Sequence, residues 1–229
     1  MLILKIPILV LGVYHIWRSF TPPHRPTHSE RLPPSLIGRF AVPFVSFMKL
    51  AHSIICACEI VLILSYYEIP PHLPTGYQSY LLCARNITIT PTFLIGSVLA
   101  IAGAQLRLVC YRTLGRLFTF EMAIRKDHKL ITAGPYAYVR HPAYAGLLMT
   151  MAGEAIIQCS RGSWLRECGL LSMFAPRVYL ALLIFPMLLL SYSSTMRGIR
   201  EDKSLEELFG DEWRDWAKRT PYRLIPSIY

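Results

Sequence analysis

Five long apolar runs constrain this chain most strongly, because a helix of about 20 apolar residues matches the roughly 30 Å hydrocarbon core of a membrane. The runs cover residues 2–17, 41–67, 91–111, 144–159 and 170–196. Hydrophobic residues make up 53% of the 229 positions and charged residues 17%, against about 25% charged in a typical soluble domain. The chain is therefore predicted to be all-α, an integral membrane protein with about five transmembrane helices.

The first run is short and contains Lys5 and Pro7. A signal peptide is the alternative interpretation. The residues that follow, 18–20, do not form a small-residue cleavage site, which favours a first transmembrane span.

Basic residues set the expected orientation, because Lys and Arg concentrate in cytoplasmic loops. They crowd into 18–39, 107–140 and the region after 197, whereas the loops 68–90 and 160–169 carry few. This alternation places the N-terminus outside and the C-terminus in the cytosol. The net charge of +10 lies between apolar runs rather than on a polar surface, so a nucleic-acid partner is not expected. Asn86 of the sequon 86–88 falls on the lumenal side, too close to the third run for glycosylation to be expected.

Two polar regions complete the layout. The Pro-rich stretch 21–34 indicates an extended cytosolic connector. In the tail, apolar side chains recur at helical spacing and predict an amphipathic helix over about 198–218, lying against the bilayer or over the cytosolic loop. These side chains are Leu205, Leu208, Phe209, Trp213 and Trp216.

The segment 134–146, GPYAYVRHPAYAG, stands at the mouth of the fourth run. Pro135 and Pro142 interrupt helix, since a proline biases the residue before it to extended conformations. Irregular backbone at membrane depth is tolerated where it is buried in protein or lines a cavity. We therefore expect this segment to wall a pocket, the alternative being an interfacial aromatic belt.

Arg197 and Glu201 stand four residues apart just beyond the fifth run and share one helix face. A guanidinium can fork onto a carboxylate ligand, and the neighbouring carboxylate can hold an ammonium, a hydroxyl or a sulfonium. An ordinary surface ion pair is the alternative interpretation.

Other reactive residues have simpler interpretations. Cys56 and Cys58 are spaced for neither a zinc site nor a redox motif, so buried thiols and no metal are expected. Charged residues inside predicted spans are functional candidates by default. Among these, Glu154 and Arg177 are expected to pair with each other or to line a substrate tunnel. Lys49 and Arg107 are expected to snorkel to the cytosolic interface.

The residues from 128 to 229 resemble the isoprenylcysteine carboxyl methyltransferase family, within the membrane methyltransferases that include phospholipid methyltransferases. The matching stretches are HKLITAGPYAYVRHPAYAG at 128–146, REDKSLEELFGDEW at 200–213 and TPYRLIPSIY at 220–229. The resemblance implies S-adenosylmethionine as cofactor, bound by a cytosolic loop and the C-terminal helix. The residues it assigns to that cofactor are His128, Lys129, Leu130, Ile131, Tyr136, His141, Pro142, Tyr144 and Glu201. It places Arg197 beside the substrate carboxylate, and it leaves Glu121, where the family often has an amide, without a clear role.

The resemblance implies a protein-S-isoprenylcysteine O-methyltransferase of the endoplasmic-reticulum membrane. Such an enzyme methylates the C-terminal carboxylate of farnesylated or geranylgeranylated proteins after their CaaX tail is trimmed. The resemblance also divides the chain into two regions. Residues 1–113 hold the first three transmembrane helices and the Pro-rich connector, and residues 114–229 form the catalytic region. An α-carboxylate, with a pKa of about 3.5, needs no general base, so alignment and exclusion of water are what the enzyme supplies. The alternatives are a phospholipid N-methyltransferase, a sterol reductase sharing the HPxYxG element, and a non-catalytic scaffold or transporter.

Overall fold

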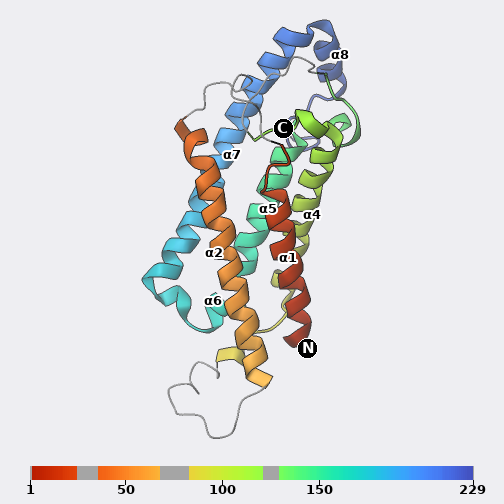
Figure 1. Cartoon of the computed structure of the whole chain (residues 1–229). Helices are drawn as coiled ribbons and strands as arrows, with labels where there is room; N and C mark the ends of the chain where they lie inside the picture. The colour runs from red at the N-terminus through yellow and green to blue at the C-terminus, as the bar shows by residue number, and fades with distance from the viewer. Residues whose placement is uncertain (1, 25–35, 68–82, 121–128, 229) are drawn as a thin grey trace, which may run out of the picture.

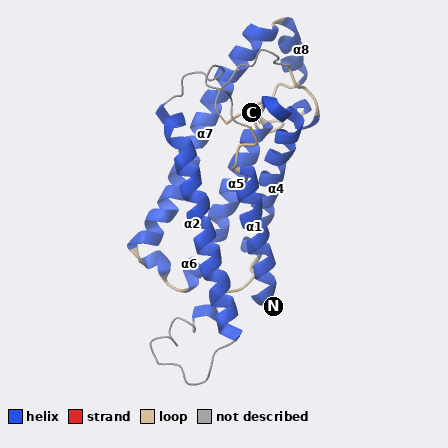
Figure 2. Ribbon diagram, in the orientation of Figure 1, coloured by secondary structure: helices blue, strands red, loops and turns tan. Residues whose placement is uncertain are grey.

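The computed structural model describes residues 2–24, 36–67, 83–120 and 129–228. The described part is a bundle of long helices without strands, which confirms the predicted all-α class (Figures 1 and 2). The long helices are α1 (Lys5–Ser19), α2 (Leu36–Tyr67), α4 (Pro91–Leu114), α5 (Pro142–Cys159) and α7 (Phe174–Phe209). The short elements are α6 (Trp164–Glu167), α8 (Asp211–Arg219) and the 3-10 turns η1 (Leu2–Leu4), η2 (Gly115–Leu117), η3 (Gly134–Ala137) and η4 (Leu170–Ser172).

Three segments in the described residues are long and apolar enough to cross a membrane: Leu2–Ser19, Pro43–Tyr66 and Pro91–Leu117. They coincide with the first three predicted spans. Helices α5 and α7 occupy the places of the fourth and fifth, and the count of five spans stays a prediction.

Glycines bring α4 and α5 together more extensively than any other pair of described helices. A Cβ atom on Gly103 of α4 would lie 2.6 Å from the carbonyl oxygen of Gly146 on α5. A Cβ atom on Gly96 would lie 2.9 Å from the carbonyl oxygen of Gly153. Small residues of this kind let helix backbones touch inside a membrane, where apolar burial alone does not drive association.

A buried ion pair and a disulfide hold the bundle at the end where α1 begins and α5 finishes. The Lys5 ammonium lies 2.5 Å from the Glu59 carboxylate and donates to the Gly162 carbonyl at 2.7 Å. Beyond them, Cys83 and Cys168 form a disulfide. The sequence offered no signal for this pairing, since 85 positions separate the two cysteines. Cys56 is a buried free thiol, as expected, whereas the free thiol of Cys58 is only partly buried.

The tail helix differs from the prediction. Residues 198–209 continue α7 without a break, because this stretch contains no proline and its single glycine, Gly198, does not interrupt the helix. The break comes at Gly210, whose φ of 55° is the left-handed conformation that glycine adopts easily. The prediction of one amphipathic helix over about 198–218 is therefore wrong in its bounds, because the stretch is divided at Gly210 between the end of α7 and the separate helix α8.

Two expectations about charged residues are also wrong. Glu154 pairs with His52 rather than with Arg177, whose Nε donates to the Leu171 carbonyl at 2.7 Å. Arg107 does not snorkel outward but is buried, and it donates to the carbonyls of Ser19 and Ala143 at 3.0 and 2.9 Å. A buried guanidinium needs several acceptors, and the ends of α1 and α5 supply them.

We expect Gly103→Ala to lower the free energy of unfolding by about 1–3 kcal/mol, the usual cost of forcing a methyl group into a closely packed site. Gly12→Ala is the matched control, because nothing lies within 4 Å of its added Cβ. The control should be neutral or stabilise by up to about 1 kcal/mol, since alanine favours helix. Thermal unfolding of both variants in one detergent checks this, and equal stabilities would contradict the packing role of Gly103.

Candidate functional site

The segment 134–146 turns sharply before it enters α5. Gly134 has a φ of 62°, η3 follows, and α5 begins at Pro142 with His141 as its N-cap. The turn is tied to the C-terminal segment by two backbone bonds, from Arg140 N to Tyr222 O at 2.9 Å and from His141 N to Arg223 O at 2.8 Å. The predicted interruption of helix is confirmed. The pocket that this segment is expected to wall stays a prediction.

Helix α8 folds over this turn. Its Trp213 and Trp216 are buried in an apolar cluster with Tyr111 and Tyr136, and the Trp216 indole donates to the Tyr136 carbonyl at 3.1 Å. The apolar face of the tail was expected to lie either against the bilayer or over the cytosolic loop, and these two tryptophans lie over the loop. Their contacts hold the loop in place.

Arg197 and Glu201 form the predicted i,i+4 pair, and Tyr144 joins it. The Arg197 Nε and the Tyr144 hydroxyl both donate to Glu201 Oε1, at 2.9 and 2.7 Å. The guanidinium also donates from Nη1 to the Phe120 carbonyl at 2.6 Å and lies 5.8 Å from the centre of the Tyr144 ring. Residues from α5 and the far part of α7 thus meet around one carboxylate.

A second carboxylate, Asp202, gathers three cationic side chains. Its Oδ2 accepts from Arg140 at 2.8 Å and from Arg223 at 3.0 Å, and its Oδ1 lies 3.0 Å from His141 Nε2. The other ring nitrogen of His141 lies 3.5 Å from Glu201 Oε2. Gly198 makes room for the imidazole, because a Cβ there would lie 3.1 Å from the ring. His141 thus bridges the two carboxylates.

These contacts fix the charges of the site. Burial disfavours the imidazolium, but hydrogen bonds to Asp202 and Glu201 outweigh burial and raise the pKa of His141 to about 9. Burial likewise disfavours the Glu201 carboxylate, but His141 and Arg197 lower its pKa to about 2. The pKa of Asp202 is lowered against its burial, chiefly by its hydrogen bond with His141. At pH 7 the two carboxylates are ionised and His141 is protonated, so His141 offers no proton-accepting nitrogen.

The structure brings together Tyr136, His141, Pro142, Tyr144, Arg197 and Glu201 of the predicted site, on the start of α5 and the turn before it and on the extension of α7. Leu130 and Ile131 pack against the apolar cluster under α8, and Lys129 is exposed. His128 and Glu121 lie outside the described residues. No three His, Cys, Asp or Glu side chains in the described ranges are placed to hold a metal ion.

Sequence reasoning missed the role of Asp202 and of its partners Arg140 and Arg223. Asp202 follows Glu201 directly, and Arg223 stands in the TPYR motif, so each was within a stretch already singled out. Their meeting depends on contacts across 62 and 21 positions of chain, which no local pattern indicates.

The pKa of His141 predicts a pH-dependent stability. Because the pKa of His141 is about 9 in the folded chain and about 6.5 in the unfolded chain, its protonation stabilises the folded state fully below pH 6.5, and this contribution disappears as the pH rises through 9. The free energy of unfolding should fall by about 3 kcal/mol over this window. Unfolding measured from pH 6 to 10 should show the decline in the natural chain and a flatter profile in His141→Gln. Parallel profiles would contradict the assignment.

Comparison with known proteins places these contacts in context. The model of the isoprenylcysteine carboxyl methyltransferase family matches residues 95–207. A protein-S-isoprenylcysteine O-methyltransferase B of Arabidopsis thaliana is 30% identical over 129 residues, 55% of each chain. The Homo sapiens protein-S-isoprenylcysteine O-methyltransferase is 27% identical over 141 residues, 58% of this chain and 41% of its own. A Delta(14)-sterol reductase of Mus musculus is 33% identical over 102 residues, 44% of this chain and 20% of the reductase. The chain thus spans about half the length of the methyltransferases it matches.

Proposed function

Because this chain belongs to the isoprenylcysteine carboxyl methyltransferase family, we propose that it is a protein-S-isoprenylcysteine O-methyltransferase. It transfers a methyl group from S-adenosylmethionine to the C-terminal carboxylate of farnesylated or geranylgeranylated proteins. The observation that carries this proposal is that Tyr144 of α5 and Arg197 of α7 both donate to the carboxylate of Glu201.

The charges of the site fit the cofactor. S-Adenosylmethionine brings a methyl group on a sulfonium, together with an ammonium and a carboxylate. Glu201 stays ionised at neutral pH and suits one of the cationic groups, and His141, whose two ring nitrogens face Glu201 and Asp202, holds that carboxylate in place. Tyr136, Pro142 and Tyr144, with residues 128–131, complete the proposed set.

Arg197 orients the acceptor in this proposal. Its side chain is 31% exposed, and its planar guanidinium matches the geometry of a carboxylate. Glu201 and the Phe120 carbonyl hold that guanidinium in position. A carboxylate acceptor is ionised at pH 7 and needs no base. This suits a site whose histidine is already protonated.

The disulfide supports the proposed orientation. Cys83 and Cys168 lie at the end of the bundle opposite Arg197, and disulfides persist in oxidising compartments rather than in the cytosol. We therefore place five transmembrane helices in the endoplasmic-reticulum membrane, with the disulfide lumenal and the site cytosolic. Residues 1–113 supply three helices and the connector, and residues 114–229 supply the catalytic region.

The decisive experiment offers three acceptors to the purified full chain with labelled S-adenosylmethionine: S-farnesylcysteine, S-geranylgeranylcysteine and phosphatidylethanolamine. We expect a base-labile methyl ester on the prenylcysteines. Label in the lipid amine without ester would establish a phospholipid N-methyltransferase instead. Such an enzyme must take a proton from its ammonium substrate, for which the protonated His141 is unsuited.

Arg197→Ala should raise KM for prenylcysteine by at least about tenfold, since losing a charged partner of a carboxylate costs about 1.5–3 kcal/mol. KM for S-adenosylmethionine should change less. Arg200→Ala is the matched control, an exposed arginine one turn further along α7, and it should leave both constants unchanged. Equal weakening of cofactor and acceptor by Arg197→Ala would contradict the assignment.

A further inference from the structure

A cleft enters the bundle between α2 and α7, with α1 and α5 behind it. Its enclosed part measures about 60 Å³, which is room for about four to six groups the size of a water molecule or a methylene. Three of its apolar lining residues on α2 and α7, Phe44, Met48 and Leu182, are partly exposed. Ile16 and Met151, which line it from α1 and α5, are buried. The α2–α7 cleft therefore opens at the outer surface of the bundle.

Lys49 brings a positive charge into this cleft. Its side chain lines the cleft and is only 9% exposed. The ammonium donates to the Thr21 hydroxyl at 3.1 Å and lies 4.6 Å from the centre of the Trp17 ring. The hydroxyl takes one of its three N–H donors, and among the described residues no carboxylate forms an ion pair with it. A buried charge is costly unless it is paired, so this ammonium is suited to an anionic ligand.

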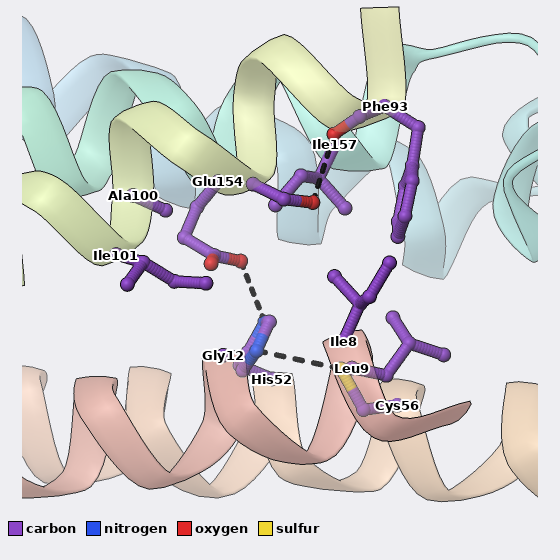
Figure 3. Close-up of a pocket in the computed structure, with 11 residues that line it drawn as sticks. Ile8, Leu9, Gly12, His52, Cys56, Phe93, Ala100, Ile101, Glu154 and Ile157 are labelled. Atoms are coloured by element: carbon purple, nitrogen blue, oxygen red, sulfur yellow. Dashed lines mark hydrogen bonds and ion pairs between the residues drawn. The ribbon is translucent and has the colours of Figure 1, made fainter. Parts of the chain in front are cut away.

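The one acidic residue that lines the same cleft already has a partner. Glu154 Oε2 lies 3.0 Å from His52 Nδ1, and the other ring nitrogen of His52 lies 3.4 Å from the Cys56 sulfur (Figure 3). His52 and Glu154 also line a smaller cavity of about 10 Å³, so they mark the inner end of the cleft. The positive charge of Lys49 and the paired charges of His52 and Glu154 thus occupy separate places in it.

The depth of Lys49 suits a lipid headgroup. Lys49 lies six positions inside the apolar span that starts at Pro43, about 9 Å along a helix. Its long side chain carries the ammonium to Thr21, just beyond the end of α1, as lysines near a membrane interface commonly do. An opening at this depth faces lipid. Basic pockets between helices on the cytoplasmic side of a membrane bind anionic headgroups, and the proposed orientation makes this the cytosolic side.

We propose that the α2–α7 cleft binds an anionic phospholipid, with its headgroup on Lys49 and part of one acyl chain against Phe44, Met48 and Leu182. The headgroup supplies the negative charge that the described residues do not give Lys49. The acyl chain matches an apolar cleft that opens to lipid. A bound lipid bridges α2 and α7, which are not among the described helix pairs in extensive contact. It therefore stabilises the bundle whether or not the chain transfers methyl groups.

Titration of the purified full chain in a nonionic detergent tests this. The probes are dioleoylphosphatidylserine, dioleoylphosphatidylcholine with the same acyl chains, and glycerophosphoserine with none. The readout is the dissociation constant from ligand-induced thermal stabilisation. The serine lipid should bind about tenfold more tightly than the choline lipid, because its net negative charge strengthens the hydrogen bond with Lys49. Equal affinity for the two lipids, or binding of glycerophosphoserine as tight as that of the lipid, would overturn the proposal.

Variants of Lys49 test the headgroup contact. Lys49→Gln should lower the affinity for the serine lipid about tenfold, to that for the choline lipid, whereas Lys49→Arg keeps the charge and should retain the preference. Arg112→Gln is the matched control, because Arg112 is an exposed basic residue in the last turn of α4. An unchanged preference in Lys49→Gln, or an equal loss in Arg112→Gln, would refute a specific contact.

Met48→Trp tests the acyl-chain contact and serves if Lys49→Gln fails to fold. The larger side chain fills the cleft and should weaken the binding of both lipids about tenfold, and unchanged affinities would refute the cleft as the lipid site. Competition then separates the lipid from the proposed acceptor. Saturating S-farnesylcysteine methyl ester should leave the affinity for the serine lipid unchanged. Displacement of the lipid would assign the cleft to the acceptor and overturn this proposal, whereas a failed methyl-transfer assay leaves it standing.

Discussion

The carboxylate of Asp202 is the interaction on which the site depends. It lies on the extension of α7 and holds Arg140 and His141 from the turn before α5, together with Arg223 from the C-terminal segment. Three chain segments are thereby joined at one buried anion. Because charge-assisted hydrogen bonds are about twice as strong as neutral ones, this contact fixes how far α7 stands from α5. Glu201, the next residue, then meets Tyr144.

The contacts of Asp202 and Glu201 with His141 also explain why the site is highly charged but holds its histidine in a form that cannot accept a proton. His141 lies between two carboxylates, and its protonated form is what makes the contact favourable. The same proton keeps both carboxylates ionised. Such an arrangement suits a reaction whose nucleophile already carries its charge, and it suits poorly a reaction that begins by removing a proton.

Several buried charged side chains in the described part of the bundle have defined partners. Lys5 and Glu59 tie α1 to α2 and to the loop after α5, far from the site. Arg107 ties the opposite end of α1 to α5 through backbone carbonyls. His52 and Glu154 lie between these two ties, where the bundle encloses its cavities. The glycines of α4 and α5 let those helices touch, and the larger cavity lies on the other side of α5, toward α2 and α7.

The sequence by itself determined the helical class, the three apolar spans, the interrupted turn at Gly134 and Pro142, and the pairing of Arg197 with Glu201. Each of these follows from residues close together in the chain, where hydrophobic length, proline and helical spacing act locally. Only the tertiary structure decided the partners of Asp202, the pairing of Glu154 with His52 instead of Arg177, the burial of Arg107 and the Cys83–Cys168 disulfide. These contacts join residues distant in sequence. A buried charge takes whichever partner the packed helices bring within reach, and helical spacing along one segment says nothing of the neighbour it will meet.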